Sequence, residues 1–268
     1  MIGRHRKDRR RAVVTDFDAR RFETDRGFAR IGGGSLGGKA RGLAFANWLI
    51  SQSGLEERFR GVRITVPTCV VLGTDVFDAF LDDNGIRSIA ITSGDDVEIE
   101  SVFARSAFPA DAREKLGAFV ASASFPLAVR SSSLLEDAKF EPFAGIYETL
   151  LIPNAHADAE VRLEQLVTAI KRIYASAFSQ KAKRHLKATN YRLEEEKMAV
   201  IVQRVVGARH GERFYPDFAG VAMSENYYPV GPVGREDGLA AVAIGLGCQV
   251  VEGGECLRFS PRFPERLV

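Results

Sequence analysis

The segment Leu127–Thr149 limits the possible folds and chemistries of this chain more than any other stretch. It starts with the apolar run Leu127–Val129, which predicts a short buried strand ending at Arg130. Polar, acidic and small residues follow: Ser131, Ser132, Ser133, Glu136, Asp137, Ala144, Gly145, Glu148 and Thr149. A guanidinium group, hydroxyls and glycine-exposed amides are donors that anion sites use, so this order favours an anion-binding loop. A charged strand end followed by a surface loop explains the same residues equally well.

Glycines also precede a predicted helix near the start of the chain. Five of them fall between Gly32 and Gly38, directly before Lys39 and a mostly apolar stretch that ends at Ile50. Glycines let a backbone approach a ligand closely and a helix N-terminus favours an anion, so Lys39 could reach a phosphate. The stretch is not a P-loop, because its glycine spacing differs and Ala40 stands where a P-loop has a hydroxyl. A glycine-rich hinge with a solvated lysine is the alternative.

The rest of the chain alternates predicted strands and helices. A run of β-branched residues indicates a strand at 66–72, and Thr74 is expected to cap the helix that follows. Apolar residues at three- and four-residue spacing predict a long helix over 161–190. The apolar run 198–206 predicts a buried strand containing Gln203, which is either a functional residue or only a polar group in the sheet. Segment 93–124 is expected to form two short helices, and segment 224–238 to be a long loop or an insertion.

Composition excludes several classes of function. The chain is 46% hydrophobic and 27% charged, which is ordinary for a globular protein of 268 residues. No apolar run approaches the roughly 18 residues of a membrane span. Its three cysteines show no Cys-x-x-Cys spacing and its four histidines are scattered, so neither disulfides nor a metal cluster is predicted. We therefore expect a cytoplasmic protein with no membrane partner.

Positive charge is concentrated at the start of the chain. Residues 4–11 contain six Lys/Arg and one Asp, a net charge of +5, although the whole chain carries only +2. The remainder therefore carries about −3 and does not make a nucleic-acid-binding surface. We expect residues 1–27 to be a basic tail or linker, because they hold few apolar residues that could dock them.

The anion-binding segment also resembles a known family. Its pattern of Val-Arg-Ser-Ser, Glu-Asp, Phe-Ala-Gly and Glu-Thr is similar to the nucleotide-binding domain of phosphoenolpyruvate synthase and of pyruvate, phosphate dikinase. Rifampin phosphotransferase carries a similar domain. Further matches occur in the family's order from about Ile31 to Ser260: Gly37-Gly38-Lys39, Val66-Pro67, Ser176–Ser179, Gln203, Gly220–Ser224 and Gly245–Gly247. Each motif is short, and it is their ordered conjunction that carries the resemblance.

The resemblance implies an α+β fold of the ATP-grasp-like type, with two lobes and the nucleotide between them. The domain would occupy residues 28–268, with a first part at 28–125 and a second part at 126–268. In the family a later strand supplies ligands to metal and nucleotide, and no such strand is recognisable before Val268. The C-terminal part of the fold is therefore expected to be truncated.

The resemblance also gives roles to individual residues. Lys39 and Arg130 would bind the ATP phosphates and act in catalysis. Gly145 and Thr149 would form the loop that faces the phosphates, and Gln203 would line the nucleotide pocket. Mg²⁺ is implied as well, with ligands expected beyond the end of the chain and none assigned within it.

The implied activity is that of an ATP-dependent phosphotransferase. Phosphate would pass to a histidine on another domain or subunit, and from there to an acceptor such as pyruvate. None of the four histidines lies in the family's Gly-x-Thr-Ser/Cys-His setting, so we expect the chain alone to be incomplete and inactive. Ile146 and Cys248 replace a glutamine and a glutamate that are common in the family. These departures favour the alternative, a nucleotide-binding regulatory module without catalysis.

Overall fold

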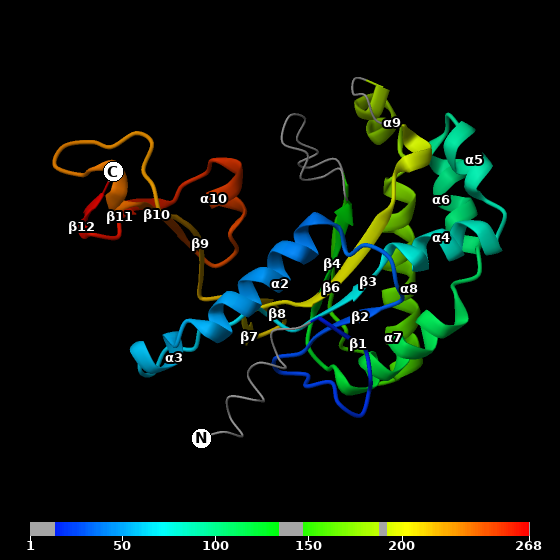
Figure 1. Cartoon of the computed structure of the whole chain (residues 1–268), viewed down its shortest axis with the longest axis horizontal. Helices are drawn as coiled ribbons and strands as arrows, with labels where there is room; N and C mark the ends of the chain where they lie inside the picture. The colour runs from blue at the N-terminus through cyan, green and yellow to red at the C-terminus, as the bar shows by residue number, and fades with distance from the viewer. Residues whose placement is uncertain (1–13, 134–146, 188–191, 268) are drawn as a thin grey trace. The chain divides into compact units, whose positions relative to one another are not determined.

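The computed structural model describes residues 14–133, 147–187 and 192–267 (Figure 1). Contacts divide the chain into two compact units, Met1–Val205 and Val206–Val268. Mixed helix and sheet is confirmed, since both occur throughout the described residues. Among these residues, no helix combines the length and the apolar character that a membrane crossing needs.

A six-stranded sheet forms the centre of the first unit. Its strands follow the order β1-β2-β3-β6-β4-β5. β1 pairs with β2 and β2 with β3 in parallel, and every other pair is antiparallel. The predicted strands at 66–72, 127–130 and 198–206 are confirmed in β3, β4 and β6. The bounds of the strands are β1 Thr15–Asp16, β2 Phe28–Ile31, β3 Cys69–Leu72, β4 Leu127–Ser133, β5 Thr149–Ile152 and β6 Met198–Arg204.

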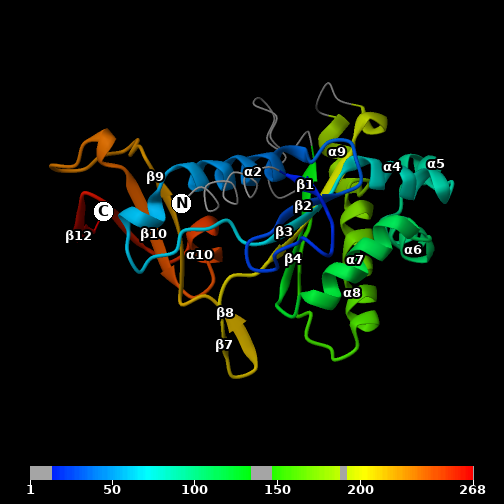
Figure 2. The same ribbon diagram turned by 60° about the horizontal axis from the view of Figure 1, so that its bottom comes forward.

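Helices cover both faces of this sheet (Figures 1 and 2). α4, α7 and α8 lie on one face, and α2 crosses the other. The two short helices expected within 93–124 are confirmed as α6 and α7. The bounds are α2 Gly37–Gln52, α3 Leu55–Arg58, α4 Thr74–Asp83, α5 Arg87–Thr92, α6 Asp96–Arg105, α7 Ala110–Ser122, α8 Ala159–Ser176, α9 Gln180–Lys187 and the 3-10 helix η1 Leu193–Glu195.

The single helix expected over 161–190 is instead two helices, α8 and α9, with the final residues of the range outside the described part. Ser179 separates them, because its hydroxyl accepts a hydrogen bond from the Ala182 amide at 3.2 Å and so starts a new helix. The apolar periodicity continues through the break, with Ala177 and Phe178 buried. Periodicity alone therefore concealed the turn.

The large hydrophobic core lies between the sheet and α4, α6, α7 and α8. Alternate residues of the central strands point into it, among them Val129 of β4 and Val200 and Val202 of β6. Aromatic rings fill the space between the helices: Phe77, Phe80, Phe103, Tyr174 and Phe178 contact one another with centroids 5.0 to 6.0 Å apart. Burying this apolar area is the main source of stability for the unit.

The opposite face of the same strands carries a much smaller apolar cluster under α2. It consists of Phe28, Ala40, Cys69, Val71 and Ile201. Only the first turns of α2 are buried there, because its second half exposes Phe45, Trp48 and Leu49. Burial raises the pKa of the Cys69 thiol, so this cysteine is an inert core residue.

The folded part begins before residue 28, where the expected basic tail would have ended. β1 pairs with β2, and Phe17 follows it into the large core, where its ring contacts Phe22 at 5.1 Å and Phe119 at 6.4 Å. The Arg30 guanidinium donates to Asp16 at 2.7 Å. Two short apolar anchors, Phe17 and Phe22, thus suffice to dock a segment that is otherwise charged.

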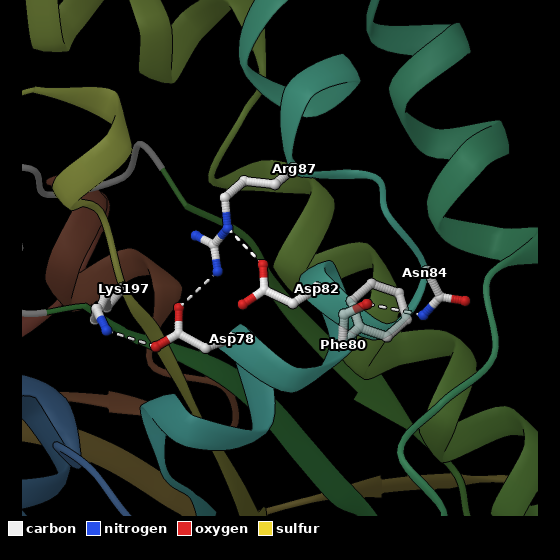
Figure 3. A network of polar contacts seen from close by, with 6 residues as sticks. All are labelled: Asp78, Phe80, Asp82, Asn84, Arg87 and Lys197. Atoms are coloured by element: carbon white, nitrogen blue, oxygen red, sulfur yellow. Dashed lines mark hydrogen bonds and ion pairs between the residues drawn. The ribbon is translucent and has the colours of Figure 1, made fainter.

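A polar network holds α4 in place (Figure 3). Asp78 accepts from Arg87 at 2.9 Å and from Lys197 at 2.5 Å, so it joins α4 to α5 and to the residue just before β6. Arg87 also donates to Asp82 at 2.8 Å, and this hydrogen bond lowers the pKa of the Asp82 carboxyl. The network matters for the site because the first residue of α4 contacts the glycine-rich turn.

The sheet contains strands from both sides of the boundary expected at 125/126, since β4 and β6 follow that boundary whereas β2 and β3 precede it. The contacts divide the chain later, between Val205 and Val206.

The second unit holds a four-stranded antiparallel sheet and a separate hairpin, β7–β8. The stretch expected to be a long loop, 224–238, contains only the 3-10 helix η2. The order in the sheet is β12-β11-β10-β9. The bounds are β7 Ala208–His210, β8 Arg213–Tyr215, β9 Phe218–Met223, η2 Arg235–Asp237, β10 Leu239–Ile244, α10 Cys248–Glu252, β11 Leu257–Ser260 and β12 Phe263–Leu267.

Candidate functional site

The glycine-rich turn between β2 and α2 is held against the start of α4. The Ser35 amide donates to the Thr74 hydroxyl at 2.9 Å, and the Thr74 amide donates to the Ser35 carbonyl at 3.0 Å. The expectation that Thr74 caps its own helix is therefore wrong. Gly73 occupies the N-cap position, because the Thr74 side chain is used to bind the turn.

The sequence had suggested that the strand ends at Arg130 and that the three serines after it begin a loop. They lie in the strand instead. β4 continues through Ser133, and all three serines are completely buried and paired with residues of β6. Ser132 contacts the start of α2: its hydroxyl donates to the Leu36 carbonyl at 2.8 Å and accepts from the Ala40 amide at 3.1 Å. Polar residues remain in this strand because tertiary hydrogen bonds satisfy them.

Lys39 lies in the first turn of α2, directly above β4. Its ammonium group is 3.5 Å from the Ser131 hydroxyl, which is the long limit of a hydrogen bond. Ser131 is the neighbour of Arg130 in the strand. Lys39 therefore contacts the strand that carries Arg130, although the two residues are 91 positions apart in the sequence.

Arg130 and Gln203 lie side by side on the α2 face of the sheet. The Arg130 guanidinium donates to the Gln203 side-chain carbonyl at 3.3 Å. Gln203 is opposite Ala128 in the register and only 7% exposed, whereas Arg130 is half-buried. The observed contact of Gln203 is thus with an arginine of the site.

Thr149 stands directly opposite Arg130 in the β4–β5 pair, so both side chains belong to the same face. Thr149 is exposed at the beginning of β5. Gly145, and with it Glu136, Asp137 and Ile146, lies outside the described residues. Four of the five predicted site residues are thereby located, and all four are grouped around β4. We call this group, Lys39, Arg130, Thr149 and Gln203, the cationic site.

The described acidic residues do not form a recognisable metal centre. Within residues 14–133, 147–187 and 192–267, no group of three or more His, Cys, Asp or Glu side chains could hold a metal ion. No protein cluster is therefore assigned to Mg²⁺, which in nucleotide sites is usually held by one or two carboxylates together with substrate phosphates.

Two cavities elsewhere in the first unit do not include the cationic site. One of about 410 Å³ is lined by residues of α6 and α8 together with Tyr147 and Glu148. Another of about 560 Å³ follows β5 and α8. Neither is lined by a member of the cationic site. The chemistry of the site, rather than the size of a cavity, identifies it: a guanidinium fork and an ammonium group beside hydroxyls suit an anion such as phosphate.

The amino-acid sequence of the chain matches a known protein family. The family model for the pyruvate phosphate dikinase AMP/ATP-binding domain matches residues 34–261. The chain belongs to this family, which confirms the resemblance inferred from its motifs. The family and its phosphotransferase members support a nucleotide-binding domain of a phosphotransferase.

Two relatives give the scale of the similarity. A phosphoenolpyruvate synthase from Aeropyrum pernix is 31% identical over 212 residues, which cover 71% of this chain and 24% of that protein. The uncharacterized phosphotransferase YvkC from Bacillus subtilis is 27% identical over 195 residues, which cover 71% of this chain and 20% of that protein. The matched part of the chain thus spans a quarter or less of the length of these relatives.

Sequence reasoning missed two features of the site. Gln203 was expected to line the nucleotide pocket, but its contact with Arg130 was not foreseen. Ser132 was treated as one of three equivalent hydroxyls, although its hydroxyl binds both Leu36 and Ala40. Neither contact leaves a local signal, because the partners lie 73 to 96 positions away.

Proposed function

We propose that this chain is the nucleotide-binding domain of an ATP-dependent phosphotransferase resembling phosphoenolpyruvate synthase, with an ATP-grasp-like fold. The observation that supports this most is the grouping of Lys39 and Arg130 around β4. Both residues match phosphate-binding positions of the family by their sequence motifs. Arg130 lies in β4, and Lys39 contacts the same strand at Ser131.

In this proposal the two cations bind the phosphate oxygens of ATP. Arg130 presents a fixed fork of donors from a strand, and Lys39 presents a point charge at the beginning of a helix. Gln203 accepts one guanidinium hydrogen and so orients the fork, which leaves the other donors for the phosphate. Thr149, opposite Arg130, adds a hydroxyl at the edge of the site.

Positioning and charge neutralisation are most of what phosphoryl transfer requires of a protein. Neutralising the phosphate oxygens lets an attacking group approach, and the same cations stabilise charge on the leaving group. Mg²⁺ bound together with ATP would supply further positive charge to offset that of the phosphates. Its protein ligands would have to come from outside the residues that the structure describes.

The acceptor of the phosphate would be a histidine on another domain or subunit. None of the four histidines of this chain is in the Gly-x-Thr-Ser/Cys-His setting of the family's phosphorylated histidine. His210, for example, stacks on Tyr215 at 4.1 Å in the β7–β8 hairpin. From the carrier histidine the phosphate would pass to an acceptor such as pyruvate.

The test combines a binding measurement with a product measurement on the same preparation. ATP is titrated calorimetrically into the full chain in MgCl₂, and AMP is then assayed after addition of pyruvate. We expect ATP binding without AMP formation, because the carrier histidine is not on this chain. Steady AMP production would contradict the prediction that the carrier histidine lies on another domain or subunit. An absence of ATP binding would contradict the proposal as a whole.

A second experiment separates the enzyme from its alternative, a regulatory module that binds nucleotide without catalysis. The chain is mixed with a carrier domain containing the family's phosphorylated histidine, together with ATP and Mg²⁺. Phosphorylation of the carrier supports the phosphotransferase. Tight ATP binding with no phosphorylation of the carrier supports the regulatory module.

A further inference from the structure

We propose that Ser132 is a positioning residue, which clamps the first turn of α2 to β4 and so fixes Lys39 relative to Arg130. This inference rests on the proposed function, because it concerns the geometry of the same cationic site. Ser132 is completely buried and is not expected to touch the nucleotide. Its effect would be exerted through the helix that carries Lys39.

The hydroxyl of Ser132 joins both ends of one helical turn. It donates to the carbonyl of Leu36, the N-cap residue of α2, and accepts from the amide of Ala40 in the first turn. The Leu36 side chain makes no capping hydrogen bond. A strand residue more than 90 positions away therefore does the capping that a serine or aspartate usually does from the N-cap itself.

The backbone of Ser132 approaches the same turn closely. A Cβ atom on Gly37 would lie 1.7 Å from the Ser132 carbonyl oxygen, which is far too close for two non-bonded atoms. Gly37 also has φ of 72°, in the left-handed region that favours glycine. The hydroxyl of Ser132 therefore binds this turn of α2, and the lack of a side chain on Gly37 lets the turn lie close to the backbone of the strand.

This clamp determines where the two cations stand. Lys39 lies between the clamped residues Leu36 and Ala40, so its backbone moves only with the turn. Arg130 precedes Ser132 by two positions, on the same face of the same strand. Because Lys39 has a long flexible side chain, a fixed backbone is what confines its charge, and misplacing such a group weakens its contacts.

A purely structural role for Ser132 makes a different prediction. In that case Ser132→Ala would lower stability, and nucleotide affinity would follow only the fraction of folded protein. The positioning role instead predicts that the effect of Ser132 on affinity depends on Lys39. A double-mutant cycle separates the two roles.

The first experiment measures ATP affinity by calorimetry for the full chain under conditions where every variant is folded. The variants are Ser132→Ala, Lys39→Ala, Arg130→Ala and the two pairs containing Ser132→Ala. We expect Ser132→Ala to weaken binding roughly five- to tenfold alone, to add little to Lys39→Ala, and to multiply with Arg130→Ala. Full multiplication with Lys39→Ala would overturn the proposal.

Gly37→Ala provides an independent variant, because its new methyl group would collide with the Ser132 carbonyl and push the same turn away from β4. It is expected to weaken ATP binding by a similar factor and to be non-additive with Ser132→Ala. Ser133→Ala is the matched control, since Ser133 is equally buried in the next position of β4. We expect it to leave the affinity of the folded protein unchanged, and an equal loss of affinity would argue against a special role of Ser132.

A second readout does not depend on nucleotide. Cys69 is buried in the cluster with Ala40, so separation of the α2 turn from the sheet would expose its thiol. In a Cys248→Ser, Cys256→Ser background, Ser132→Ala should speed thiol labelling of Cys69 at least tenfold in native buffer, and Ser133→Ala should not. If the chain bound no ATP, the proposed function would fail and this labelling would still decide the clamp; unchanged labelling would overturn it.

Discussion

The two faces of the six-stranded sheet differ sharply, although the same strands build both. On one face β4 and β6 contribute Val129, Val200 and Val202 to the large core. On the other, the alternating residues are Arg130, Ser132, Ile201 and Gln203, which lie under or beside α2. One face therefore supplies stability, and the other combines a small apolar cluster with polar side chains that can perform chemistry.

The difference suggests separate roles for the two faces. We expect a change on the packed face to alter the free energy of unfolding, and a change of Arg130 on the α2 face to alter binding. Polar side chains on the α2 face satisfy one another, as Gln203 does for Arg130 and Ser132 does for the α2 backbone. The predictions below test whether the two faces can be perturbed separately.

The largest expected effect is that of Phe80→Ala on the packed face. Phe80 is completely buried among Phe103, Phe108 and Tyr174. Truncation should lower the free energy of unfolding by about 3 to 5 kcal/mol in urea denaturation, because it leaves a cavity. ATP affinity of the folded protein should not change. A loss below about 1 kcal/mol would show that this core is loosely packed.

Tyr174→Phe should have a much smaller effect on the same face. The Tyr174 hydroxyl is buried with no hydrogen-bond partner among the described residues, so its removal should change stability at pH 7 by less than about 1 kcal/mol. Burial raises the pKa of Tyr174, so the wild-type protein should lose stability as the pH rises above about 10, the pKa of an unfolded tyrosine. Tyr174→Phe should remove that part of the alkaline loss. Equal alkaline slopes in urea denaturation would contradict the assignment.

Deletion of residues 1–11 should have the smallest effect of all. This segment holds six of the positive charges but few apolar residues, and the first anchor in the core is Phe17. We expect an unchanged melting temperature and unchanged ATP affinity, measured by calorimetry. Phe17→Ala is the contrasting variant and should lower stability by about 3 kcal/mol. A large fall in melting temperature on deletion would show that the basic segment is part of the fold.

Much of the packed face could be predicted from the sequence, because its elements carry local signals. Runs such as 127–129 and 198–202 are apolar enough to indicate buried strands without any knowledge of their partners. The order of motifs also singled out Lys39, Arg130, Thr149 and Gln203. Each of these residues lies in β4, is paired with it or contacts one of its residues.

The remaining features depend on contacts that leave no local trace. Serines are weak indicators of a strand, so the continuation of β4 through Ser133 was missed; these hydroxyls are buried because distant partners such as Leu36 and Ala40 satisfy them. The break between α8 and α9 lies inside an unbroken apolar pattern. The segment around β1 docks through a few apolar side chains, Val14, Phe17 and Phe22, which a count of charges does not reveal.

The central claim is that ATP is bound on the α2 face, through Arg130 above all. Arg130→Ala should weaken ATP binding by about 1.5 to 3 kcal/mol, roughly 10- to 150-fold in calorimetry. Lys39→Ala should weaken it less, because an ammonium group on a flexible side chain is a point charge and lacks the fixed fork of donors that a guanidinium offers to phosphate. Arg204→Ala is the matched control. Arg204 pairs with Leu127 on the opposite face, over the Phe125 ring and 3.3 Å from Asp25.

The decisive measurement is therefore the ATP titration of the wild-type chain, Arg130→Ala and Arg204→Ala, side by side at equal folded fraction. The account predicts a large loss of affinity for Arg130→Ala and no change for Arg204→Ala. Equal affinities in all three proteins, or a loss confined to Arg204→Ala, would contradict it and place the nucleotide elsewhere on the molecule.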